Sequence, residues 1–237
     1  MKIDILTIFP KMFDSPFAES LIKRAIDNKI IQINTIDIRS FSKDKHKKVD
    51  DKPFGGGVGM VLKPEPIFDA LKNSGVKKKN KEYKNRYNKP LIIYMSPQGK
   101  VLNNKIVNNL SNFKKLIILC GHYEGIDERI MNFVDEEISI GDFVLTGGEL
   151  PAMVLIDAVA RMLPGVVKEF NSVKNDSFYN GILDYPQYTR PAIFKGLSVP
   201  KQLLSGNHRE IENWRLKQAY LATKKKRPDL LKNKVKI

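Results

Sequence analysis

The chain has 237 residues, of which 42% are hydrophobic and 9% aromatic, a composition too apolar for a disordered protein. Lys and Arg number 41 against 26 Asp and Glu, giving a formal net charge of +15. No apolar run reaches the roughly 18 residues of a membrane span, and a single cysteine, Cys120, excludes an internal disulfide. We therefore expect a cytoplasmic protein with no membrane partner, built from one large and one small domain.

The first part of the chain alternates predicted strands and helices. Residues 2–9 predict a buried strand, 12–29 a loop leading into a helix, and 31–38 a second strand. A glycine-rich loop, DDKPFGGGVGM, follows at residues 50–60, and residues 63–75 predict a short helix. This alternation is typical of an α/β fold.

The same alternation continues through the middle of the chain. Residues 90–95 predict a strand, 102–112 a modest helix, 115–120 an apolar strand, and 150–163 a strong apolar helix. The segment between the last two holds two glycine-containing motifs and no clear periodicity. A mostly parallel sheet is the expected architecture.

The domain boundaries follow from a change in composition after the strong helix. Residues 1–165 form the predicted core domain, and residues 166–180 are polar and aperiodic, as expected of a flexible linker. Residues 181–237 predict a small helical domain.

The positive charge is segregated along the chain. Residues 72–89 hold eight Lys or Arg and one Glu, and residues 181–237 hold thirteen basic and four acidic residues. Residues 119–185, in contrast, hold four basic and twelve acidic residues. Basic flanks around an acidic centre indicate contact with a polyanion by the flanks, and chemistry or a subunit interface in the centre. For the 72–89 run alone, a lysine-rich proteome is the alternative explanation.

Three glycine-containing motifs each follow a predicted strand or precede a predicted helix. They are SPQG at residues 96–99, CGHYEGIDER at 120–129 and SIGDFVLTGGELP at 139–151. Ligands of α/β sheets bind beyond the carboxyl ends of strands, where glycine permits close approach of the backbone. Each motif alone could be an ordinary turn, but three in succession predict one shared pocket.

The glycine-rich loop at 50–60 matches neither phosphate-binding fingerprint. Counting from Gly55 and Gly57, the position that a dinucleotide motif reserves for its third glycine holds Met60, and no Gly-Lys-Ser/Thr follows. A nucleotide-dependent α/β enzyme is therefore disfavoured. The loop instead supplies flexible backbone for a lid or for contact with a polyanion.

Most ionisable residues of the acidic centre have structural explanations. Asp127 is a predicted helix cap, and Asp142 and Glu149 stand near a turn and a helix start. Asp176 differs, because it stands in the predicted linker, where packing does not require it. Arg161 stands on the polar side of an apolar helix, where a salt bridge is its alternative role.

The motifs GGGVGM, SPQG, CGHYEGIDER, SIGDFVLTGGELPA, DSF, YTRP, LLSGNH and WRLKQ occur in this order. Together they resemble the bacterial tRNA (guanine-N1)-methyltransferases of the SPOUT knotted methyltransferase superfamily. The resemblance implies an α/β fold with a mostly parallel sheet and a deep trefoil knot, a small helical C-terminal domain that binds tRNA, and a homodimer. It also implies S-adenosylmethionine as methyl donor, magnesium as a supporting ion, and no DNA partner.

The resemblance further implies which residues act. The target is N1 of the guanosine just 3′ of the anticodon (tRNA position 37) when another guanosine precedes it. Asp176 is implied as the base that removes the N1 proton, with Arg161 in a supporting role. Residues implied to contact the donor come from the three motifs: Tyr94, Met95, Ser96, Pro97, Gly99, Gly121, Tyr123, Glu124, Gly125, Ser139, Ile140, Gly141, Phe143, Leu145, Gly147 and Gly148.

One residue departs from the family pattern, since His122 stands where many relatives carry Arg. A noncatalytic RNA-binding protein of the same fold is the alternative function. Degraded SPQG or YEG motifs, or loss of Asp176 and Arg161, would favour that alternative, and all of these are intact.

Overall fold

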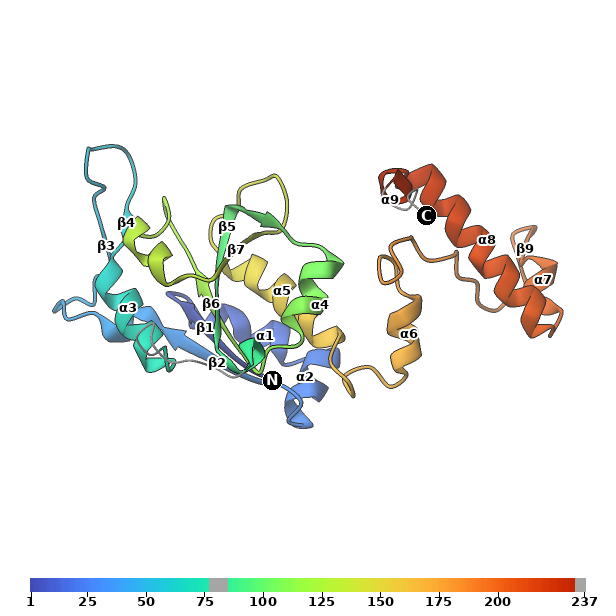
Figure 1. The fold of residues 1–237 in the computed structure, drawn as a ribbon, viewed down its shortest axis with the longest axis horizontal. Helices are drawn as coiled ribbons and strands as arrows, with labels where there is room; N and C mark the ends of the chain where they lie inside the picture. Colours follow the sequence, from blue (N-terminus) through green and yellow to red (C-terminus); the bar gives the residue numbers. More distant parts are fainter. Residues whose placement is uncertain (77–84, 233–237) are drawn as a thin grey trace. The chain divides into compact units, whose positions relative to one another are not determined.

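The structure is a computed structural model that describes residues 1–76 and 85–232 (Figure 1). Residues 77–84 of the basic run 72–89, a run predicted to contact a polyanion, lie outside the described residues, as do residues 233–237. The chain divides into two compact units, Met1–Lys168 and a second that begins at Glu169. Each unit is described by itself.

The first unit is built on a five-stranded sheet in the order β2-β1-β6-β5-β7, and every neighbouring pair is parallel. Its strands are β1 (Lys2–Thr7), β2 (Gln32–Asp37), β5 (Leu91–Val101), β6 (Lys115–Cys120) and β7 (Glu136–Ser139). A short antiparallel pair, β3 (Asp50–Asp51) and β4 (Val61–Leu62), stands apart from this sheet. The predicted α/β fold with a mostly parallel sheet is confirmed.

Helical segments connect the strands of the first unit. The α-helices are α1 (Asp14–Phe17), α2 (Ser20–Asp27), α3 (Pro64–Asn73), α4 (Asn104–Leu110) and α5 (Glu149–Arg161). The 3-10 helices are η1 (Pro10–Phe13), η2 (Ile38–Phe41), η3 (Arg86–Asn88) and η4 (Glu128–Phe133).

The strands β1 and β6 are buried along nearly their whole length because helices cover both faces of the sheet. On one face, Ile117 and Leu119 of β6 belong to a core cluster with Ile67 and Leu71 of α3. A second cluster joins α2 to the last turn of α5 and the residues that follow it. The sheet is therefore the middle layer of three, and the carboxyl ends of β5, β6 and β7 point to the same edge.

Two predicted elements of the first unit differ from the structure. The strand predicted at 90–95 continues to Val101, because a bulge lets both Met95 and Lys100 pair with Ile138 of β7. The helix predicted within 12–29 is broken into η1, α1 and α2. Ser20 has a φ of 58°, a left-handed conformation that does not continue a helix from α1.

The second unit is mostly helical, as the sequence predicts. Its elements are α6 (Phe170–Asn175), β8 (Ile193–Phe194), β9 (Leu197–Ser198), α7 (Lys201–Leu204), α8 (His208–Lys226) and α9 (Asp229–Lys232). The side chain of Asn207 caps α8 by accepting hydrogen bonds from two backbone amides of its first turn. The β8–β9 hairpin was not predicted, and α6 lies within the segment 166–180 that the sequence predicts as a linker.

Within the described ranges, none of the helices combines the length and the apolarity that a membrane crossing requires.

A buried polar contact joins the end of β1 to the start of α5. The Thr7 hydroxyl, fully buried, donates to the Glu149 carboxylate at 2.7 Å and accepts from the Phe9 amide at 2.9 Å. We predict that Thr7→Val lowers the free energy of unfolding by about 1–3 kcal/mol, because it leaves these buried groups without their partner. Thr35→Val, at an exposed position of β2, is the control. Equal urea midpoints for the two variants would contradict this role.

Candidate functional site

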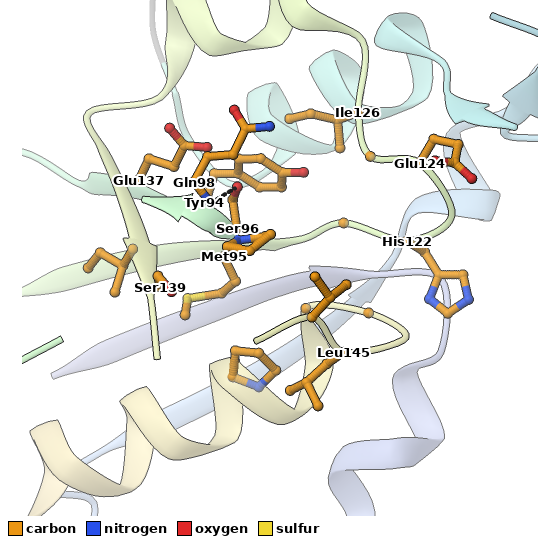
Figure 2. Close-up of a pocket in the computed structure, with 18 of the residues that line it drawn as sticks. Tyr94, Met95, Ser96, Gln98, His122, Glu124, Ile126, Glu137, Ser139 and Leu145 are labelled. Atoms are coloured by element: carbon orange, nitrogen blue, oxygen red, sulfur yellow. Dashed lines mark hydrogen bonds between the residues drawn. The ribbon is translucent and has the colours of Figure 1, made fainter. Parts of the chain in front are cut away.

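A cavity of about 320 Å³ lies at the carboxyl ends of β5, β6 and β7. Three loops line it: the bulge within β5, the loop after β6 and the loop between β7 and α5. This is the edge at which parallel α/β sheets bind ligands. Figure 2 shows Gln98, Glu137 and the ring of Tyr94 gathered on one side of the cavity, with Glu124 and His122 on the other.

The first loop is the bulge of β5. The Ser96 hydroxyl accepts a hydrogen bond from the Gln98 amide at 3.1 Å and stabilises the loop after Met95. Gly99 closes the bulge against β7, where a side chain would overlap the backbone of Glu137 and Ile138. The glycine is thus required by strand packing, and the residues before it turn toward the cavity.

The second loop follows β6 and packs on Tyr94. A side chain at Gly121 would lie 2.7 Å from the Tyr94 hydroxyl, so glycine is needed for this close approach. Tyr123 and Gly125 have φ angles of 59° and 125°, which form the sharp turn of the YEG motif. Burial, reinforced by the negative charge of Glu137, raises the pKa of Tyr94 to about 12. Tyr94 is therefore a neutral phenol at physiological pH and cannot serve as a base.

The glycine-rich loop at 50–60 is tied to the same turn. The Leu62 amide donates to the Gly125 carbonyl at 3.0 Å, and the Glu124 amide donates to the Met60 carbonyl at 3.0 Å. The Glu124 side chain packs directly on Gly59, which leaves no space for a side chain there. The end of the glycine-rich loop therefore borders the cavity beside Glu124.

The third loop is held against the second by the backbone. The Gly148 amide donates to the Gly121 carbonyl at 2.8 Å, and His122 and Gly147 form an isolated antiparallel bridge. A side chain at Gly148 would lie 2.8 Å from the Cα of Cys120, so the two backbones touch without one. This contact determines the position of Glu149, whose buried carboxylate begins α5.

The carboxylates in the described lining of the cavity are not balanced by Lys or Arg side chains. Three carboxylates line it, those of Glu124, Glu128 and Glu137, and its described lining includes no Lys or Arg. His122 is its single imidazole, with the Nδ1 atom 4.0 Å from the Glu149 carboxylate. Such a lining repels phosphate groups and favours a ligand that carries positive charge.

The cavity brings together fourteen of the residues that the sequence predicts as donor contacts. They are Tyr94, Met95, Ser96, Pro97, Gly121, Tyr123, Glu124, Gly125, Ser139, Ile140, Phe143, Leu145, Gly147 and Gly148. Gly99 and Gly141 do not line it, since Gly99 packs on β7 and Gly141, with a φ of 150°, turns the backbone beside Phe143. Of the predicted catalytic residues, Arg161 ends α5 in the first unit and Asp176 stands just after α6 in the second.

Several lining residues were not predicted: Gln98, Ile126, Glu128, Met131, Glu137, Ile138, Val144, Thr146 and Pro151. Six of them lie within the three predicted motifs, whose boundaries could have indicated them: Gln98, Ile126, Glu128, Val144, Thr146 and Pro151. Glu137 and Ile138 belong to β7, a strand that was not predicted. Among the described residues, no group of three or more His, Cys, Asp or Glu side chains is arranged to hold a metal ion.

Comparison with known proteins agrees with the motifs. The tRNA (guanine-1)-methyltransferase TrmD family model matches residues 1–233. The chain belongs to this family. The tRNA (guanine-N(1)-)-methyltransferase of Endomicrobium trichonymphae is 68% identical over 98% of this chain and 100% of its own length. Enzymes of the same name from Ruminiclostridium cellulolyticum and Fervidobacterium nodosum are 54% and 55% identical, over 97% of this chain and over 96% and 89% of their own lengths. The family resemblance inferred from the motifs is confirmed.

The raised pKa of Tyr94 gives a test of the packing in this tRNA (guanine-1)-methyltransferase family member. Folding favours the neutral phenol of Tyr94, because burial disfavours the phenolate. The folded state therefore has its full stability below the ordinary pKa near 10, and it loses stability as the pH rises toward about 12. We predict that the wild-type chain loses about 1–2 kcal/mol more stability than Tyr94→Phe between pH 9 and pH 11. Urea unfolding at both pH values measures this, with Tyr220→Phe on the exposed face of α8 as the control. Parallel losses in all three proteins would contradict it.

Proposed function

We propose that this chain transfers a methyl group from S-adenosylmethionine to N1 of a guanosine in tRNA. The observation that carries the proposal is the cavity lined by three glutamates and by no Lys or Arg among its described residues. A sulfonium donor is a cation, so this lining suits it, whereas nucleotide phosphates would be repelled. The family membership and the names of the relatives support the same reaction.

The three loops would hold the donor mainly through their backbone. Gly121 and Gly148 keep the second and third loops close, and the residues from Tyr94 to Pro97 form the opposite wall. When bound, the donor supplies a methyl group that its positive sulfur already activates. The chain therefore has to align this methyl group with the acceptor and to exclude water from the space between them.

The acceptor nitrogen carries a proton, which makes guanine N1 a poor nucleophile. We assign removal of this proton to the Asp176 carboxylate and a supporting role to Arg161. The target is the guanosine just 3′ of the anticodon when another guanosine precedes it, as the family resemblance implies. Arg161 belongs to the first compact unit and Asp176 to the second.

We also propose a homodimer with sites at the subunit interface. Exposed apolar side chains on the third loop and α5 support it: Phe143, Val144, Leu150 and Val154 are 55%, 81%, 49% and 48% exposed. Such a patch beside a binding cavity is typical of a surface that a second protein covers. The finer fold assignment, a deep trefoil knot, is supported by the family membership.

The domain roles complete the proposal. Residues 1–165 would bind the donor, 166–180 would link the domains, and 181–237 would bind tRNA through their positive charge. A cytoplasmic location fits a tRNA substrate and the buried thiol of Cys120. The described residues offer no cage for magnesium, so no step is assigned to that ion. Nothing favours the noncatalytic alternative, because the loops of the cavity and the Asp176 and Arg161 pair are intact.

The reaction and its base can be tested together. Wild-type protein, S-adenosylmethionine and a tRNA with paired guanosines should yield N1-methylguanosine, and a tRNA lacking the first guanosine should react poorly. Asp176→Asn should reduce the single-turnover rate by about 10²–10⁴-fold, because it removes the proton acceptor while keeping the side-chain shape. Asp229→Asn, in the same unit, is the control. Near-normal methylation by Asp176→Asn with unchanged tRNA binding would refute the assignment.

The basic end of α8 gives a separate prediction about tRNA binding. Lys224, Lys225 and Lys226 are exposed in its last turn. Replacing all three by Gln should weaken tRNA binding and make it less sensitive to salt. The slope of log K against log salt should fall in magnitude by about 0.9 for each phosphate that the variant no longer neutralises. The same change at Lys11, Lys23 and Lys29, exposed in the first unit, provides a charge-matched control. An unchanged slope in the α8 variant would count against this surface.

A further inference from the structure

The β8–β9 hairpin of the second unit presents apolar side chains at its surface. Ile193, Phe194 and Leu197 are 65%, 60% and 75% exposed. In the register of the hairpin Phe194 lies opposite Leu197 and Ile193 lies opposite Ser198, so Phe194 and Leu197 share one face. Single exposed apolar residues are ordinary, but several on one short element indicate a surface that a partner covers.

The backbone holds these side chains in a defined geometry. Lys195 and Gly196, the two residues of the turn, have φ angles of 49° and 78°, the left-handed pair that matches the twist of a tight hairpin. The Val199 amide donates to the Ala192 carbonyl at 2.9 Å and closes the hairpin at its open end. The ring of Phe194, next to the turn, is therefore presented on an ordered support.

The segment around the hairpin is basic. Residues 185–209 hold four exposed Lys or Arg and no Asp or Glu. Arg190 stands just before the hairpin, and the Lys195 ammonium lies 5.6 Å from the centre of the Phe194 ring. The central part of a protein–protein interface is depleted in lysine, so a lysine at this ring disfavours a protein partner. An exposed ring beside basic side chains is typical of surfaces that bind single-stranded nucleic acid.

We propose that the Phe194 ring stacks on an unpaired base of the tRNA anticodon loop other than the methylated guanosine, with Lys195 beside the adjacent phosphate. This inference rests on the proposed function, which places the target in that loop. Every base has a flat π face, so stacking on an aromatic ring tolerates any sequence. The hairpin therefore adds affinity for the loop and leaves recognition of the guanosines to other residues.

The first test is a titration of labelled tRNA with the full chain at several salt concentrations. Phe194→Ala and Phe194→Leu should each weaken binding by about 5–150-fold, the loss typical of one base–aromatic stack. Phe194→Tyr keeps the ring and should stay within about threefold of wild type. Ser198→Ala, in the same hairpin, is the control. Normal affinity in Phe194→Leu would overturn the inference, because an apolar side chain without a π face would then suffice.

The salt dependence in the same titrations separates stacking from charge. The slope of log K against log salt should be unchanged in the Phe194 variants, because they lose no charge. In Lys195→Gln the slope should fall in magnitude by about 0.7, the value for one phosphate of a single strand. An unchanged slope in Lys195→Gln would overturn the contact assigned to Lys195, and an altered slope in Phe194→Leu would contradict stacking.

The second test identifies the base by coupling. tRNAs with one abasic nucleotide at each anticodon-loop position in turn are bound to wild type and to Phe194→Leu. At one position the abasic substitution should weaken binding by wild type but not by Phe194→Leu, because the stack is already lost. Independent losses at every position would overturn the inference. So would a Phe194→Leu variant that changes the oligomeric state in ultracentrifugation and binds tRNA normally, since the hairpin would then contact a second copy. Failure of the wild-type chain to bind tRNA would instead refute the proposed function.

Discussion

The contact between Gly148 and Gly121 is the constraint on which the rest of the first unit depends. One backbone hydrogen bond of 2.8 Å joins the two loops, and a side chain at either glycine would overlap its neighbours. The bond fixes where α5 begins, and therefore where the buried Glu149 carboxylate meets Thr7 at the end of β1. Three loops that are distant in sequence thus form a single cavity because two backbones can touch without side chains between them.

The distribution of charge follows from this arrangement. The chain carries a net charge of +15, yet the described lining of the cavity contains three glutamates and no Lys or Arg. Exposed basic residues gather elsewhere, as in the last turn of α8 with Lys224, Lys225 and Lys226. A cationic methyl donor is attracted by acidic side chains, whereas a polyanionic acceptor is attracted by basic ones. The chain has acidic side chains at the cavity and basic ones at the end of α8. Burial raises the pKa of the Cys120 thiol well above its usual range, so this cysteine, directly before Gly121 of the cavity lining, is a protonated and unreactive thiol.

Much of this fold could be predicted from the sequence, and the failures have physical causes. The strands β1 and β6 could be predicted because strands buried on both faces are mostly apolar. The length of β5 was missed, because Gly99 allows a bulge inside a strand where SPQG suggests a turn. The strand β7 was missed, because its two glutamates look unsuited to a central sheet although it is an edge strand.

The candidate site was predictable to a similar degree. Motifs identified the three loops, since close backbone approach requires glycine and glycine is visible in sequence. Glu137 was missed because its part in the cavity comes from the placement of β7.

The central claim is that an acidic cavity formed by three loops selects a cationic methyl donor. Isothermal titration of the wild-type chain with S-adenosylmethionine and, separately, with ATP tests it most directly, because both share adenosine and differ in charge. The account predicts saturable binding of S-adenosylmethionine that Gly148→Ala weakens, and no measurable binding of ATP at the same concentrations. Comparable affinity for ATP, or no binding of S-adenosylmethionine, would contradict it.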